Sequence, residues 1–372
     1  MITNRISRRF CILTFALSLV LMFWVDGVYA SRVVSHEIES TAIAKNMVGI
    51  SNIRHVEVYL PDGYEDEKYR YPVIYYIPGW TQPQSVGGDF FRNVLDDSIK
   101  NGKITPTIAV FLDVHEGMLF LNSAVFGNWE DFMVSELIPF IDKTYRTIPD
   151  PKARGLTGVS SGGYTALILP ILHPNIWGSV GMNDPAFWIM WEFITDEADF
   201  PVSLKSDFAW ARSVFQTIPQ DINGYASADT YARILLQVAA SFSPNPNSPI
   251  FCDMPVTGGD WVQEAREKWS AYDLINPKTL AKYSETLKNL LSITFIVPED
   301  VATNRVSNIY FIERLQSAGI SVTRIDMPGA HGDFQPERFI ALTEQLLKAM
   351  QGSGTSVSPQ GKVATKWGEI KK

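Results

Sequence analysis

The sequence predicts an α/β fold, in which a mostly parallel central sheet has helices on both faces. Three observations predict it. Continuous apolar runs of strand length recur along the chain, as at 72–77 and 293–297, and such runs are typical of strands buried on both faces. Segments with helical periodicity separate these runs. A Gly-x-Ser-x-Gly pattern at 158–162 stands between one run and one helical segment.

The first expected strand, His55–Leu60, alternates apolar and polar residues, so it has one buried face, and a turn at Pro61–Tyr64 follows it. The remaining strands are predicted at 72–77, 106–112, 153–157, 177–182, 293–297 and 320–325, and the helices between them at 89–99, 129–145, 164–172, 304–318 and 336–350.

The first thirty residues have the pattern of an export signal. Arg5, Arg8 and Arg9 precede an apolar run from Phe10 to Trp24, and Val28-Tyr29-Ala30 ends in a small residue. The run is too short for a membrane anchor, which needs about 20 apolar residues. We expect residues 1–30 to be a signal peptide cleaved after Ala30, and the protein to be secreted or periplasmic.

Composition excludes several classes of partner. Cleavage would remove three arginines and one aspartate, so the formal net charge would change from −8 to about −10. A strongly acidic chain is a poor match for nucleic acid or anionic membranes. Cleavage would also remove Cys11 and leave Cys252 alone, which excludes an intrachain disulfide. Stability must then come from a hydrophobic core, for which residues 31–350 offer one large α/β domain.

The segment from 185 to 291 interrupts the alternation of strands and helices. It has no convincing long strand, and we expect a mainly helical, cap-like insert over the carboxyl edge of the sheet. We expect most of its aromatic residues to form a small core and a minority to line an acyl or aryl pocket. These aromatic residues include Trp188, Trp191, Phe193, Phe208, Trp210, Phe215, Trp261 and Trp269. The polar tail 351–372 is expected to be disordered.

The pattern at 158–162 has the residues of a nucleophile elbow, the sharp strand-to-helix turn that exposes a serine in α/β-hydrolases. Gly158 and Gly162 are the structural residues of the turn, because a side chain at either would crowd the backbone. Ser160 is therefore the candidate nucleophile. The helix after it offers unpaired N–H groups to a developing negative charge.

A serine nucleophile needs a base, and the base needs a carboxylate to orient it. Of the five histidines only His173 and His331 follow Ser160, and His331 is the candidate because its loop comes directly after the last expected strand. For the acid we prefer Asp300, after the strand at 293–297. Glu299 and Asp184, each also at the carboxyl end of a strand, are alternatives.

The oxyanion of an ester's tetrahedral intermediate needs backbone N–H donors. Ser161, the residue after the nucleophile, supplies one. The loop Pro78-Gly79-Trp80 follows the strand at 72–77, and there we expect Trp80 to supply the other.

Several further segments carry a resemblance to a known family: 56–64, 71–79, 127–132, 136–142, 145–147 and 329–332, together with the elbow. On these segments the sequence resembles the esterase D-like (putative esterase) branch of α/β-hydrolases, closely over 53–183 and more loosely over 268–347. This branch includes feruloyl and acetyl xylan esterases, S-formylglutathione hydrolases, enterochelin esterases and mycolyltransferases. The resemblance implies an α/β-hydrolase fold with Ser160 as nucleophile, Asp300 as acid, His331 as base, and Trp80 and Ser161 as the oxyanion hole.

Two positions depart from the family pattern. Pro78 stands where the family usually has histidine, and proline has no N–H to donate. Pro298 stands in a Val-Pro-Glu-Asp segment where the family often has Gly-x-x-Asp, and a changed turn there keeps Glu299 among the candidate acids.

These observations predict a serine esterase that acts through an acyl-enzyme on a small-molecule or polysaccharide-linked ester. The alternatives are an acyltransferase, in which an alcohol replaces water, and a non-catalytic binding protein that keeps the fold. Asp113, His115 and Glu116 follow the strand at 106–112, and we interpret them as part of a substrate wall rather than as a metal site. No phosphate loop or cofactor fingerprint is present, so we expect neither a cofactor nor a metal.

Overall fold

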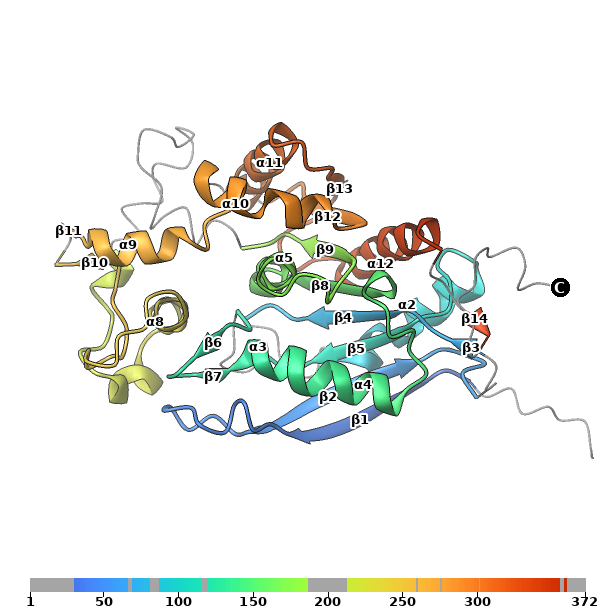
Figure 1. The fold of residues 1–372 in the computed structure, drawn as a ribbon, viewed down its shortest axis with the longest axis horizontal. Helices are drawn as coiled ribbons and strands as arrows, with labels where there is room; N and C mark the ends of the chain where they lie inside the picture. The colour runs from blue at the N-terminus through green and yellow to red at the C-terminus, as the bar shows by residue number, and fades with distance from the viewer. Residues whose placement is uncertain are drawn as a thin grey trace, which may run out of the picture.

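The computed structural model describes residues 30–65, 69–80, 87–114, 119–186, 213–258, 260–274, 276–300, 302–354 and 358–359. A twisted eight-stranded sheet forms the centre of the molecule, with strand order β1-β2-β5-β4-β8-β9-β12-β13 (Figure 1). The bounds are β1 Arg32–Glu39, β2 Ile53–Leu60, β4 Val73–Ile77, β5 Ile108–Leu112, β8 Arg154–Val159, β9 Ser179–Asn183, β12 Ser292–Pro298 and β13 Thr323–Met327.

One edge of the sheet is antiparallel and the rest is parallel. β1 pairs antiparallel with β2, and β2 with β5, whereas the five pairs from β5 to β13 are all parallel. The parallel strands β4, β5, β8 and β9 are buried along their whole length, as the continuous apolar sequences of β4 and β5 predict. Their carboxyl ends therefore meet at one edge, and the candidate site lies there.

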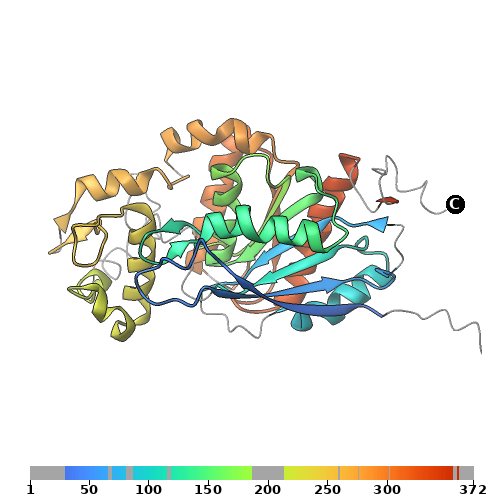
Figure 2. The same cartoon turned by 60° about the horizontal axis from the view of Figure 1, so that its bottom comes forward.

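Successive side chains of β4 pack alternately in two hydrophobic clusters, one on each face of the sheet. Ile74 and Tyr76 pack in a cluster with α2 (Gly88–Lys100) and α12 (Gln335–Gly352) on one face of the sheet. Val73, Tyr75 and Ile77 belong to the larger cluster on the opposite face, which includes α5 (Ser161–Leu172) and α11 (Ala302–Ser317). This is the period of two expected of a strand covered on both sides. Figure 2 shows the helices on the two faces of the sheet.

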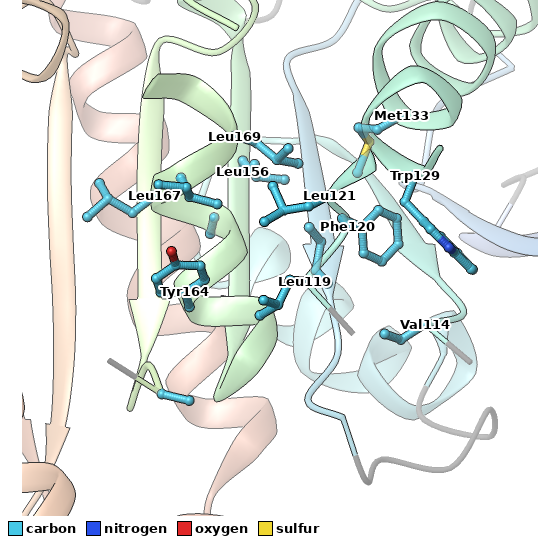
Figure 3. Packing of buried hydrophobic residues seen from close by; sticks show 14 of the residues in the cluster. Val114, Leu119, Phe120, Leu121, Trp129, Met133, Leu156, Tyr164, Leu167 and Leu169 are labelled. Atoms are coloured by element: carbon cyan, nitrogen blue, oxygen red, sulfur yellow. The ribbon is translucent and has the colours of Figure 1, made fainter. Parts of the chain in front are cut away.

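Helix α5 begins directly after Ser160, the candidate nucleophile, and its side chains pack within the larger cluster. All of its residues except Leu172 are buried, which is typical of a helix enclosed on every side. Figure 3 shows Leu169 of this helix near Leu156 of β8 and Leu121. The elbow at its N-terminus therefore rests on a close-packed support.

Two strands, β13 and β1, differ from the prediction. The last strand is shifted from 320–325 to β13, because α11 ends in a Schellman motif. Gly319 has φ 75°, and the Ile320 N–H donates to the Leu315 carbonyl, so Ile320 is buried against the helix end. Strand β1 was not predicted, because Ser35 and His36 interrupt its apolar pattern.

The helix expected at 129–145 is present but not regular. It runs as α3 (Trp129–Asp131), a π-helical segment (Phe132–Leu137) and α4 (Ile138–Thr144). Pro139 lies just after the π-helical segment. A proline inside a helix removes a hydrogen bond and clashes with the preceding turn, and the wider π geometry makes room for it.

The described part of the insert is mainly helical, as predicted. Its helices are a 3₁₀ segment (Ile222–Ser227), α8 (Thr230–Phe242), α9 (Gln263–Ser270) and α10 (Pro277–Lys288), with a short hairpin of β10 (Val256–Thr257) and β11 (Asp260–Trp261). Phe215 and Trp269 are buried in the core and Trp261 is half-buried. The other aromatic residues singled out in the sequence lie outside the described residues: Trp188, Trp191, Phe193, Phe208 and Trp210.

Few residues of the predicted signal peptide and of the predicted tail are among the described residues. The predicted signal peptide lies outside the described residues except for Ala30. In the predicted tail, α12 continues to Gly352, and β14 (Ser358–Pro359) pairs antiparallel with β3 (Tyr69–Arg70). The described helices include none with the length and apolar character needed to cross a bilayer.

Cys252 is buried, and burial raises the pKa of its thiol to about 12, so the reactive thiolate is scarce at neutral pH. We expect a thiol reagent such as Ellman's reagent to react very slowly with the folded protein. In denaturant, a chain that begins at Ser31 should release one equivalent of chromophore. Rapid reaction of the native protein would contradict the burial described here.

Candidate active site

Ser160 stands alone between β8 and α5 in a strained backbone conformation. Its φ of 56° and ψ of −121° lie outside the regions that residues with a side chain normally occupy. Such strain costs about 1–3 kcal/mol and persists where the surroundings enforce it. Here the Ser160 N–H donates to the Asn183 carbonyl at 3.0 Å, and its carbonyl accepts from the Tyr164 and Ala186 N–H groups, each at 3.0 Å.

The two glycines of the turn have no room for a side chain. A Cβ on Gly158 would lie 2.4 Å from the Gly162 carbonyl oxygen, and one on Gly162 would lie 2.2 Å from the Ile77 carbonyl oxygen. Both contacts are to backbone, which cannot rotate away. The geometry therefore gives the physical reason for glycine at both positions.

Gly158→Ala should consequently lower the free energy of unfolding by about 3 kcal/mol or more, since overpacking usually costs about 1–3 kcal/mol and here the backbone itself must move. Urea unfolding followed by circular dichroism measures the change. Gly352→Ala is the matched control, because a Cβ there meets no atom within 4 Å and should leave stability unchanged or slightly raised. Equal midpoints for the two variants would contradict the geometry of the turn.

His331 contacts a carboxylate from another strand end. It lies in the loop between β13 and α12, and its Nδ1 is hydrogen-bonded to Oδ2 of Asp184, the residue after β9. Asp184 is fully buried, and its Oδ1 accepts from the Asn308 side-chain amide at 2.9 Å. A buried carboxylate on Nδ1 selects the tautomer in which Nε2 is the acceptor of the ring.

Asp300, the preferred acid of the sequence analysis, has another partner. Its carboxylate accepts the Gly329 N–H at 3.1 Å, and its own N–H donates to the Gly329 carbonyl at 3.3 Å. Glu299 donates its N–H to the Met327 carbonyl and is exposed. The structure thus differs from the expectation: Asp184 lies against His331, while Asp300 holds the turn at Gly329, whose φ is 91°.

Asp184 reaches His331 because the chain turns immediately after β9. Its φ of 43° is left-handed, and its N–H donates to the Ile296 carbonyl of β12 at 3.0 Å. This bond holds Asp184 beside the neighbouring strand. Asp300, two residues beyond the end of β12, instead meets the backbone of the loop that precedes the histidine.

A buried arginine supports the histidine loop. Arg338 of α12 is fully buried, and its guanidinium donates to the carbonyls of Pro328 at 2.7 Å, Ala330 at 2.9 Å and His331 at 3.5 Å. Burial lowers the pKa of Arg338, and the nearby Asp184 charge opposes that shift. A planar guanidinium bonded to three carbonyls of one loop restricts the segment that carries His331.

The candidate oxyanion donors flank Ser160. A Cβ on Gly79 would lie 3.2 Å from Ser160 Cβ, so the loop after β4 passes directly beside the serine, and Trp80 is its next residue. Ser161 is the first residue of α5, where N–H groups have no helical partner. Its hydroxyl is buried and has no hydrogen-bond partner among the described residues.

Sequence reasoning missed Asn308 and Arg338. Each is a fully buried polar residue within a helix that otherwise packs against the sheet. A polar residue on the apolar face of a helix is the signal that could have indicated them, because a buried polar group requires a partner.

The residues interpreted as a substrate wall are only partly described. Asp113 is buried and lies 3.7 Å from the guanidinium of Arg54, which in turn lies over the ring of Trp129. His115 and Glu116 lie outside the described residues. Within the described part of the chain, no group of three or more His, Cys, Asp or Glu is arranged to hold a metal ion.

Comparison with known proteins agrees with this architecture. A family model described as "Putative esterase" matches residues 49–288, more than half of the chain. A protein named endo-1,4-beta-xylanase/feruloyl esterase, from Xylanibacter ruminicola, is 31% identical over 140 residues, which are 34% of this chain and 18% of that protein. An esterase from Mycobacterium tuberculosis is 34% identical over 116 residues, 30% of this chain and 25% of its own length. The chain thus spans a quarter or less of these relatives.

A solved structure has the same fold across nearly its whole length. A ferulic acid esterase superposes with a TM-score of 0.58 and 17% sequence identity, covering 87% of this chain and 99% of that one. At this identity the likeness establishes the fold alone, a mostly parallel sheet with flanking helices of the α/β-hydrolase type. Taken with the family model, these findings identify the chain as a member of the putative esterase family.

Proposed function

We propose that the protein is a serine esterase that hydrolyses carboxylic esters, with Ser160 as nucleophile, His331 as base and Asp184 as acid. The observation that carries the proposal is the pairing of His331 with a buried carboxylate, at the same sheet edge as a strained serine elbow. Trp80 and Ser161 would donate their backbone N–H groups to the oxyanion.

Each residue would have one role in two half-reactions. His331 Nε2 takes the Ser160 hydroxyl proton as the oxygen attacks the ester carbonyl, and the imidazolium returns that proton to the leaving alcohol. Asp184 stabilises the imidazolium without becoming protonated. Water then attacks the acyl-enzyme by the same route and releases the carboxylic acid.

The substrate class is proposed from the relatives' names and the aromatic insert. One relative is named a feruloyl esterase and one solved neighbour a ferulic acid esterase, so aryl esters of the hydroxycinnamate type are the first to test. Cleavage of the predicted signal peptide would release the enzyme outside the cytoplasm, where esters of polysaccharides and other large molecules are accessible.

A panel of 4-nitrophenyl acetate, 4-nitrophenyl butyrate and methyl ferulate tests the proposal. We expect hydrolysis of at least one ester, with free acid as the product. Adding an alcohol in increasing concentration separates the acyltransferase alternative, since a transferase would form the new ester at the expense of the acid. No turnover of any ester by folded protein would contradict the proposal.

A further inference from the structure

One hydrogen bond joins the insert to the loop beside the candidate nucleophile. The indole N–H of Trp80 donates to the side-chain carbonyl of Gln237 at 3.1 Å, across 157 positions of sequence. Gln237 lies on α8 and is only 4% exposed, and Trp80 is half-buried. A helix of the insert therefore contacts the loop after β4 through a specific polar interaction.

The orientation of the Gln237 amide is determined by its partners. An indole N–H can only donate, so the amide oxygen must face Trp80 and the amide nitrogen must face away. That nitrogen donates to the Tyr225 hydroxyl at 2.5 Å. Tyr225 is buried, with its ring 5.2 Å from that of Phe126 in the main core. Gln237 is thereby anchored to the core on one side and holds Trp80 on the other.

Trp80 depends on such contacts because it lies beyond the paired part of its strand. The pairing of β4 ends at Ile77, three residues earlier. The guanidinium of Arg233, one turn before Gln237 on α8, lies 5.7 Å from the Trp80 ring centre. Two residues of the same helix thus contact the indole of Trp80, the residue whose backbone N–H is the candidate oxyanion donor.

We infer that Gln237 is a positioning residue for the oxyanion hole, through which the insert contributes to the rate of the reaction. The inference rests on the proposed function, in which the Trp80 N–H binds the oxyanion. Such a donor must stand 2.7–3.1 Å from the developing charge, and a displacement of about 1 Å can cost about 10²-fold in rate. Because the oxyanion exists only in the transition state and intermediates, the loss should fall on kcat.

Gln237→Met tests the inference, because methionine keeps the unbranched shape and removes both hydrogen bonds. We expect kcat for the best ester of the panel to fall about 10- to 100-fold, with KM changed less than about twofold. Affinity for a trifluoromethyl ketone, which forms an anionic adduct with the serine, should fall in parallel. Affinity for the product acid should not change.

Two further variants make the result interpretable. Gln263→Met, the same change at an exposed position of α9, should leave all these quantities at the wild-type value. Trp80→Phe removes the same hydrogen bond from the other side and keeps the backbone N–H. It should reproduce the loss of kcat, and the double variant should lose little more than either single one. If circular dichroism shows that Gln237→Met is not folded, Trp80→Phe with Gln263→Met as its control tests the inference instead.

The outcomes separate the inference from the proposed function. Wild-type turnover with unchanged kcat and ketone affinity in the Gln237 and Trp80 variants would overturn the inference and leave the proposed function standing. An increase in KM alone would also overturn it, because it would indicate a role in substrate binding. A wild-type protein that neither hydrolyses esters nor binds the ketone would overturn both.

Discussion

Ser160→Ala should lower kcat for ester hydrolysis by about 10⁶-fold, the scale seen when the nucleophile of a serine hydrolase is removed. Alanine keeps the backbone of the elbow and the neighbouring glycines but has no oxygen to attack the carbonyl. Any residual rate would come from substrate binding and the oxyanion donors alone. Initial rates with a 4-nitrophenyl ester at high enzyme concentration measure the loss.

The matched control is Ser317→Ala, at an exposed serine of α11 whose hydroxyl donates to the Glu313 carbonyl in the preceding turn of its own helix. It should hydrolyse esters at the wild-type rate. Circular dichroism should show that both variants are folded. A Ser160→Ala protein that retained a tenth of the wild-type rate would show that another group performs the attack.

Asp184→Asn should lower kcat by about 10⁴-fold, whereas Asp300→Asn should lower it less than about tenfold. An asparagine opposite His331 Nδ1 keeps the shape but favours the wrong tautomer and removes the charge that stabilises the imidazolium. At position 300 the carboxylate accepts the Gly329 N–H, and an amide oxygen accepts that bond equally well. Steady-state rates of the two variants with the same ester make the comparison.

This pair of substitutions distinguishes the geometry from the sequence-based expectation, which preferred Asp300. A larger loss at Asp300 than at Asp184 would indicate that the loop after β12 rearranges to bring Asp300 to the histidine. Thermal unfolding of both variants serves as the control, because Asp184 also accepts from Asn308 and its substitution changes a buried hydrogen bond.

The sheet and most of its helices could be predicted from the sequence because burial on both faces leaves a strong local signal. β4 and β5 are continuous apolar runs, β9 and β12 are largely apolar, and each of the four was predicted to within three residues. The tight turn at Ser160 could also be predicted, since it requires glycines at the neighbouring positions 158 and 162. β1, an edge strand with polar residues in its middle, has no such signal.

The partner of the histidine could not be predicted, because the choice depends on tertiary geometry. Asp184, Glu299 and Asp300 all follow parallel strands and were all candidates, but the local sequence does not show which of them reaches the histidine. Which of them meets His331 depends on the left-handed turn at Asp184 and on the hydrogen bond of Asp300 to the loop backbone. The contact between Trp80 and Gln237 spans 157 positions and has no local pattern at either end.

The central claim is that the Ser160 hydroxyl is a base-activated nucleophile, and covalent labelling tests it most directly. A fluorophosphonate should react with the folded wild-type protein, and mass spectrometry of its peptides should locate one adduct, on the Ser160 oxygen. The Ser160→Ala protein should remain unmodified, and Asp184→Asn should react far more slowly than wild type. Folded wild-type protein that stays unmodified at Ser160, or carries its adduct elsewhere, would contradict the account.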